Sequence, residues 1–133
     1  MKYEVILIIR HIDWVNKKVQ FALSNDDLLL TTSEFPRHIY ENNSFISEIL
    51  NKLLKLHTGF SIDYIPIKLL SYKDDGLWLD ENCKRLGSFI YVCTIPEIHK
   101  DYPTKWIDTL KLHEVLQGND NKLLREINLC STF

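Results

Sequence analysis

Arg37 and His38 are the neighbouring side chains best suited to bind an anion. They follow Pro36 and stand a few residues before a segment with helical spacing that ends near His57. A guanidinium beside an imidazole can pair with a phosphate or a carboxylate without any metal ion. The sequence therefore predicts an anion-binding rim in front of a helix. The other interpretation is that both side chains are solvated loop residues with no ligand.

Three further residues are candidates for contact with the same ligand. His57 closes the predicted helix, where the helix dipole favours a cation, and that role alone can explain it. Trp78 lies in a polar loop, so its indole can face a ligand and stack on a base; alternatively, it folds back over the core. Arg85 follows Lys84 in the same loop and completes a predicted contact surface.

Acids and metal-ligating side chains are sparse in this region. Between residues 37 and 59 the only carboxylates are Glu41 and Glu48. A metal site that combines them with distant acids is conceivable, but solvated surface carboxylates are the simpler interpretation. The five histidines are dispersed without metal-ligand spacing, so the sequence predicts no zinc site and no other metal or cofactor. It contains no P-loop, no Gly-rich dinucleotide fingerprint and no recognisable pairing of a nucleophile with a base.

Length and composition describe one ordinary globular domain. A chain of 133 residues, 45% hydrophobic and 26% charged, is expected to form a single domain over residues 1–133. The net charge of −2 is evenly distributed and gives no electrostatic reason to bind nucleic acid or an anionic membrane. The apolar run at 5–9 is too short for a signal-peptide core or a membrane span. Three cysteines without paired spacing favour reduced thiols, so we expect a soluble cytoplasmic protein.

Hydrophobic periodicity predicts strands, a helix, more strands and a closing helix, in that order. A helix capped at 43–44 is expected to run to about residue 57, with Gly59 as its left-handed stop. A second helix is expected over about 119–129. This order gives an α+β fold, an α/β/α sandwich. The expected strands cover residues 3–9, 18–23, 28–32, 65–72, 87–95 and a short entry at 103–107.

The segment from Pro36 to Phe60 resembles a Nudix box. The family's box reads Gly, five residues, Glu, seven residues, Arg-Glu, apolar, any, Glu-Glu, any, Gly, apolar. With Gly59 at the last glycine, Ser44 stands at the first glutamate and Lys52 at the arginine. The residues at the three remaining glutamates are Leu53, Leu56 and His57. Downstream, the paired strands near 67–72 and 85–92 and the Trp106-Ile107 segment are also similar to the family, so the resemblance covers about residues 35–129.

The resemblance implies a mixed sheet between one box helix and a C-terminal helix, but a changed function. Nudix hydrolysis needs Mg²⁺, which prefers hard oxygen ligands, and Leu53 and Leu56 provide none. Our leading hypothesis is a catalytically inactive Nudix-like domain that binds a nucleotide or nucleoside-diphosphate derivative as a sensor or regulatory module. The ligand is expected in the remnant cleft near Arg37, His38 and Trp78.

Two alternatives stay open. In the first, Leu53 and Leu56 fill the cleft, and the protein is an interaction or assembly subunit that binds a protein partner or a second copy. Trp14 and the N-terminal strands are then candidates for the interface. In the second, the protein is a divergent Mg²⁺-dependent pyrophosphohydrolase that uses relocated carboxylates. A filled cleft predicts no nucleotide-induced rise in melting temperature, whereas a ligand bound in an open cleft raises it.

Overall fold

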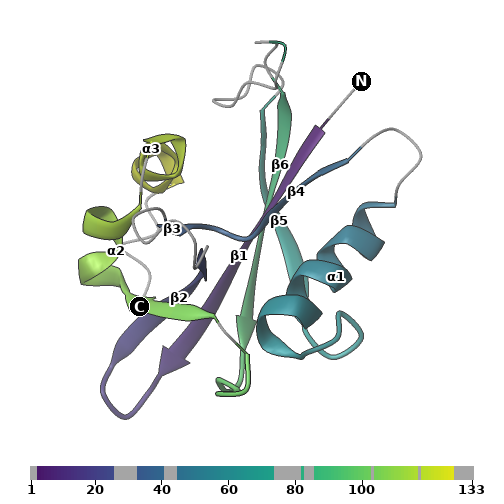
Figure 1. Ribbon diagram of the computed structural model, residues 1–133. Coiled ribbons are helices and arrows are strands. Elements are labelled where there is room, and N and C mark those ends of the chain that lie inside the picture. The colour runs from purple at the N-terminus through teal and green to yellow at the C-terminus, as the bar shows by residue number, and fades with distance from the viewer. Residues whose placement is uncertain are drawn as a thin grey trace.

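A mixed β-sheet forms the centre of the protein in the computed structural model (Figure 1). The structure describes residues 3–25, 33–40, 45–73, 82, 86–102, 104–116 and 118–127. The strands are β1 (Tyr3–Asp13), β2 (Lys18–Asn25), β3 (Ser33–Glu34), β4 (Arg37–Tyr40), β5 (Ile67–Lys73), β6 (Gly87–Ile95) and β7 (Lys105–Asp108). The helices are α1 (Ile46–Thr58), α2 (Thr109–Val115) and α3 (Gly118–Ile127).

β1 is the central strand and connects the rest of the sheet. It pairs in parallel with β6 along most of its length, antiparallel with β4 at its start and antiparallel with β2 at its end. β5 lies beside β6 at one edge of the described sheet, and β3 and β7 pair with β2. The residues from Val5 to Ile9 are all apolar and fully buried, as a strand covered on both faces requires.

α1 covers one face of the sheet, and α2 and α3 lie on the other (Figure 1). Alternate residues of β1 serve the two layers, because successive side chains of a strand point to opposite faces. Val5, Leu7 and Ile9 belong to the core under α1, whereas Ile6 and Ile8 belong to the core under α2 and α3. The predicted α+β sandwich is therefore confirmed.

The predicted order of strands, helix, strands and helix is also confirmed, but β3 and β4 are not predicted, and the ends of other elements differ. α1 begins after the predicted cap at 43–44, with Phe45 in the N-cap position and no side-chain hydrogen bond there. Gly59 ends α1 with φ 80°, as predicted. The seven-residue α2 is not predicted, because so short a segment shows little periodicity. The predicted strand at 28–32 lies outside the described residues. No helix in the described ranges is long and apolar enough to cross a membrane.

Candidate anion-binding site

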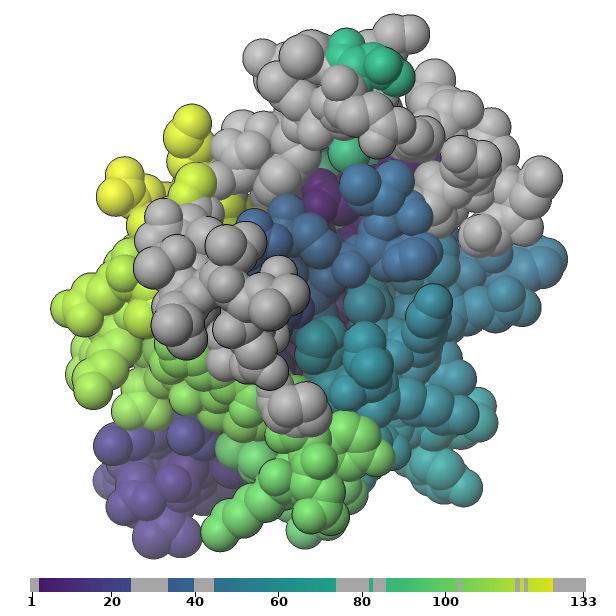
Figure 2. All heavy atoms as spheres, in the orientation of Figure 1, coloured from purple at the N-terminus to yellow at the C-terminus, as the bar shows by residue number. Residues whose placement is uncertain are grey.

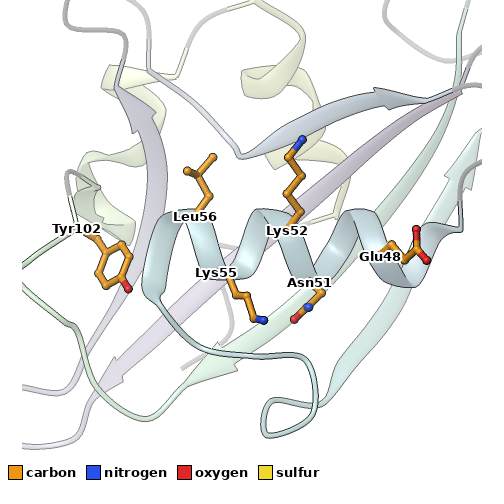
Figure 3. A pocket seen from close by; sticks show the side chains of 6 residues that line it. All are labelled: Glu48, Asn51, Lys52, Lys55, Leu56 and Tyr102. Carbon is orange, nitrogen blue, oxygen red and sulfur yellow. The ribbon is translucent and has the colours of Figure 1, made fainter.

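A hollow of about 680 Å³ lies over the outward side of α1 (Figure 3). Lys52 and Leu56 project from one side of the helix, and Asn51 and Lys55 project from the other. Tyr102, from the segment after β6, stands beside the C-terminal end of the helix. The lining of the hollow includes the ammonium groups of Lys52 and Lys55, which extend to opposite sides of the helix, together with an amide, a phenol and a carboxylate. Its lining residues are Glu48, Asn51, Lys52, Lys55, Leu56 and Tyr102.

The spacing of residues along α1 explains why these side chains face outward. Positions three or four apart lie on one side of a helix, and apolar residues at that spacing turn toward the core. The intervening positions point away from the sheet, which leaves Lys52 and Lys55 exposed. The buried residues of α1 are Ile49, Leu50, Leu53, Leu54 and Thr58.

Leu53 and Leu56 have different environments, although the sequence places both at box positions. Leu53 is 5% exposed and packs in the core under α1. Leu56 is 62% exposed and lines the hollow. One of the two leucines is therefore part of the core, and the other leaves the surface above it open to solvent.

Tyr102 reaches the end of α1 because the segment after β6 lies against the helix. Figure 2 shows this segment (green) next to the α1 region (teal) on the surface. Thr104 donates a hydrogen bond from Oγ1 to the carbonyl oxygen of His57 at 2.6 Å, which satisfies one of the open carbonyls at the helix end. A Cβ added at Gly59 would lie 2.6 Å from the Tyr102 phenol oxygen. Both the positive φ and the neighbouring ring therefore require glycine at this position.

Asn51 is held in place by the loop that follows α1. Its Oδ1 accepts hydrogen bonds from Ile62 N at 2.9 Å and from Ser61 Oγ at 3.5 Å. Because both bonds use the amide oxygen, the Nδ2 group is the part of the side chain left to donate. With Lys52 and Lys55 it gives the hollow three nitrogen donors, and the only carboxylate among the described lining residues is that of Glu48. Such a lining suits an anionic ligand.

The structure places Arg37 and His38 on opposite faces of the sheet. Both belong to β4, where Arg37 pairs with Ile6 of β1 and His38 pairs with Val5. Residues directly paired across antiparallel strands share a face. His38 therefore lies on the face covered by α1 and Arg37 on the face covered by α3. The two side chains predicted to form one rim are separated because they occupy a strand, not a loop.

Arg37 is the centre of a buried ion cluster under α3. Its guanidinium donates to Glu4 Oε1 at 3.0 Å and to Asp120 Oδ1, and its Nε is 3.5 Å from Glu34 Oε2. Glu4 and Asp120 are 2% and 1% exposed, so their charges depend on this cation. Asp120 Oδ2 also accepts a hydrogen bond from the backbone N of Phe35 at 2.9 Å. The guanidinium is thus engaged by carboxylates of its own chain.

His38 and His57 are both half-buried. Burial lowers the pKa of His57, which favours the neutral imidazole near pH 7. The neutral form differs from the cation expected at this helix end. A neutral imidazole offers hydrogen bonds to a ligand but no charge.

The remaining predicted contacts, Trp78 and Arg85, lie outside the described residues. Conversely, the sequence reasoning overlooks Asn51, Lys55 and Tyr102. The two helical residues carry a usable signal, because they alternate with the apolar positions of α1. Tyr102 carries none, because its place beside Gly59 depends on how a distant segment folds back.

The described side chains form neither a metal centre nor an activated thiol. Within the ranges that the structure covers, no group of three or more His, Cys, Asp or Glu side chains is arranged to hold a metal ion. Cys93 is buried in β6, and burial raises the pKa of its thiol to about 12. The nucleophilic thiolate is therefore disfavoured at this position.

The sequence matches no protein-family model, and no curated protein matches it significantly. Solved structures do match. A mutT/nudix family protein from Listeria innocua has a TM-score of 0.70 at 12% identity, over 93% of this chain and 89% of the other. The NUDIX domain of Shewanella oneidensis NrtR, complexed with ADP ribose, has a TM-score of 0.66 at 14% identity, over 95% and 84%. The C. elegans Ap4A hydrolase has a TM-score of 0.65 at 11% identity, over 95% of each chain. The chain therefore has a Nudix-like fold, as predicted, and function must be argued from its site.

Proposed function

We propose that this Nudix-like fold serves as a binding domain that recognises a nucleotide or nucleoside-diphosphate derivative through its phosphates, without metal-dependent hydrolysis. The observation that carries the proposal is the hollow over α1 with three nitrogen donors in its lining. Lys52, Lys55 and Asn51 line it, and Glu48 is the one carboxylate among its described lining residues. Ammonium and amide groups donate to phosphate oxygens, and a net positive lining attracts them. Tyr102 adds an aromatic ring on which a base can stack.

The residues at the box positions support binding over hydrolysis. Mg²⁺ prefers six oxygen ligands in octahedral array, and a Nudix-type reaction needs the ion to activate water. In the alignment anchored on Gly59, the positions of the last three glutamates hold Leu53, Leu56 and His57. Two aliphatic side chains and a desolvated imidazole supply no oxygen ligand, so we infer a pseudoenzyme with a sensor or regulatory role.

The proposed site differs in part from the residues predicted from the sequence. Because Arg37 is engaged by buried carboxylates, we assign the phosphate contacts to Lys52 and Lys55. His38 and His57 stay predicted contacts, and neither is among the described residues that line the hollow. Trp78 and Arg85 stay predicted contacts. The ADP ribose bound to the Shewanella domain makes this compound the first ligand to test.

Differential scanning fluorimetry tests for binding. The purified protein is heated with ADP-ribose, nucleoside diphosphates and sugar nucleotides, each in EDTA and each in Mg²⁺. A ligand at a hundred times its Kd stabilises the fold by about 2.7 kcal/mol, which gives a clear rise in Tm. A rise in EDTA supports the proposal. A rise that requires Mg²⁺, together with turnover of ADP-ribose or dinucleoside polyphosphates, favours the divergent hydrolase. No rise with any compound contradicts nucleotide binding.

The double variant Lys52→Ala/Lys55→Ala tests the location. We expect the ligand-induced rise in Tm to disappear, because the phosphates lose both cations. Without ligand, Tm should change little, since exposed substitutions alter stability by no more than about 0.5 kcal/mol. Lys111→Ala/Lys122→Ala is the matched control, because it also removes two positive charges, from exposed positions on α2 and α3 in the opposite layer. A ligand response that survives in Lys52→Ala/Lys55→Ala would move the site away from α1.

A protein-interaction role is the second candidate function, and β5 is the observation that favours it. β5 lies at the edge of the described sheet and exposes Leu69, Leu70 and Tyr72 by 48%, 39% and 41%. An apolar edge strand can pair with a strand of another chain, although a lysine such as Lys68 discourages such pairing. Light scattering across a concentration series tests for a second copy, with Leu69→Lys expected to abolish any dimer. A monomer at every concentration, with a ligand response, favours the first candidate.

A further inference from the structure

Glu4 is a buried carboxylate that uses only part of its hydrogen-bonding capacity. It shares a strand face with Ile6, so its side chain lies on the α3 side of β1. Oε1 accepts from Arg37 Nη1 at 3.0 Å, whereas Oε2 is buried and has no hydrogen-bond partner among the described residues. Ser88 of β6 pairs with Glu4 in register, and its buried hydroxyl also has no partner there. Such unpaired buried atoms are rare and call for a physical explanation.

A second buried carboxylate attaches α3 to the sheet. Asp120 lies in the first turn of α3. Its Oδ1 accepts from the guanidinium of Arg37, and its Oδ2 accepts from the backbone N of Phe35. Further along α3, Leu123 and Leu124 pack in the core on this side of the sheet. Arg37 therefore connects the anchor of α3 directly to Glu4.

Among the described residues, the cluster contains one cation and three carboxylates. Arg37 of β4 faces Glu4 from β1, Glu34 from β3 and Asp120 from α3, and the Glu34 side chain is 50% exposed. Burial lowers the pKa of Arg37, but the attraction of Asp120 and the two glutamates raises it by more. The net effect is a raised pKa, so Arg37 stays a cation. Burial raises the pKa of Glu4 to about 7, against the attraction of Arg37 and with the repulsion of Asp120. Near neutral pH, Glu4 changes charge while Arg37 does not.

We propose that Glu4 is a protonation switch that controls how firmly α3 is docked against the sheet. With Glu4 neutral, Asp120 is the one buried anion beside Arg37 among the described residues, and its attraction to the guanidinium is not shared with Glu4. With Glu4 ionised, two buried carboxylates share that guanidinium and repel each other. The attachment of α3 through Asp120 then weakens, so docking is firm below neutral pH and looser above it.

The stability of the whole protein should follow the same direction. The ordinary pKa of a glutamate is 4.5 and that of folded Glu4 is about 7, so between these values the folded protein binds the proton more tightly. Stability from such a group is complete below the unfolded pKa and is lost as pH rises through the folded pKa. In this window the equilibrium constant for unfolding rises by up to about tenfold per pH unit through this one group.

Hydrogen exchange at the α3 amides between pH 5.5 and 8.5, corrected for the intrinsic rate of exchange, tests the switch. In the wild type we expect protection of α3 to fall as pH passes through 7, while α1 amides in the same sample show no such step. Glu4→Gln keeps a neutral side chain of the same shape, so α3 should retain its low-pH protection throughout. Glu34→Gln is the matched control. It removes the charge of a half-exposed carboxylate that also contacts Arg37, and the fall in α3 protection near pH 7 should persist.

Two results would overturn the proposal. One is α3 protection that stays flat with pH in the wild type. The other is a step that persists in Glu4→Gln, which would assign it to another group, such as His113, whose Nδ1 lies 3.3 Å from Asn121 Oδ1 of α3. If Glu4→Gln fails to fold, NMR titration of the Glu4 carboxyl carbon in the wild type replaces it. A transition near pH 4.5 then overturns the proposal, and one near 7, coincident with the α3 step, supports it.

Discussion

The two faces of the sheet are closed in different ways. On the α1 face, leucine and isoleucine side chains of the helix pack against Val5, Leu7 and Ile9 of β1. On the α3 face, similar apolar packing is accompanied by the buried cluster around Arg37. β1 contributes to both faces by strict alternation, and Glu4 is its one buried charged residue. An apolar contact is indifferent to pH, whereas a buried ionic contact depends on the protonation of each member.

This difference suits the two layers to different tasks. Apolar packing holds α1 rigidly against the sheet. The outward-facing Lys52, Lys55 and Asn51 therefore lie on a rigid element, as a binding site requires. The ionic contact between Asp120 and Arg37 holds α3, and its strength depends on the protonation of Glu4. The docking of α3 can therefore respond to pH while the sheet stays intact. The predictions below test whether the two faces do differ in this way.

The largest effect is expected from removing the cation of the cluster. Arg37→Met leaves Glu4 and Asp120 buried without a counter-charge, which should lower the free energy of unfolding by about 3–5 kcal/mol at pH 8. At pH 5.5 the loss should be smaller, because Glu4 is then protonated in the folded state. Urea denaturation at the two pH values measures both losses. Equal losses would show that the cluster acts through packing alone.

On the opposite face, Leu54→Ala should lower the free energy of unfolding by about 2–5 kcal/mol, because it opens a cavity in the core under α1. Leu54 is fully buried in this core. No charge is involved, so urea denaturation should give the same loss at pH 5.5 and pH 8. Leu56→Ala is the control on the same helix, because that leucine is exposed and should change stability by no more than about 0.5 kcal/mol. A pH-dependent loss at Leu54 would remove the contrast between the faces.

The end of α1 should be sensitive to a single methyl group. Gly59→Ala should cost about 1–2 kcal/mol through its left-handed backbone, and more because the Tyr102 ring must move. Gly118→Ala is the matched control, since φ there is also positive but a Cβ would meet nothing within 4 Å. Thermal unfolding of both variants isolates the cost of displacing the ring. Equal costs would mean that Tyr102 is not held against the helix.

The elements that the sequence predicts well are those with a strong local pattern of apolar residues. β1 contains a continuous apolar run and α1 has a helical spacing of apolar residues, so both elements and the sandwich follow from the sequence. Lys52 and Lys55 are predictable as outward positions of α1 for the same reason. Tyr102 is not, because its place in the hollow depends on a contact between distant segments.

The ion cluster shows what residue type alone can and cannot establish. The sequence predicts that Arg37 contacts an anionic ligand, whereas in the structure its guanidinium contacts two buried carboxylates. Those carboxylates come from Glu4 and Asp120 of the same chain, brought together by strand pairing and helix docking. Neither strand pairing nor helix docking produces a recognisable pattern near Arg37 in the sequence, so its two partners could not be identified without the fold.

The smallest effect is expected at His57, and its sign should be opposite to that of Glu4. Burial lowers the pKa of His57 below its ordinary value of 6.5. The stability that it contributes is therefore complete above pH 6.5 and is lost as pH falls through the folded pKa. Acidification should weaken the α1 side through His57 while it strengthens the α3 side through Glu4.

The quantity to compare is the Tm at pH 5.5 minus the Tm at pH 7.5. This difference should be more positive in His57→Gln than in the wild type. Because the other histidines are unchanged, subtracting the two differences isolates His57. Adding Glu4→Gln should make this difference in Tm more negative, since it removes the stabilisation that acid provides on the α3 face. If both substitutions moved the difference in the same direction, the opposite signs argued for His57 and Glu4 would be wrong.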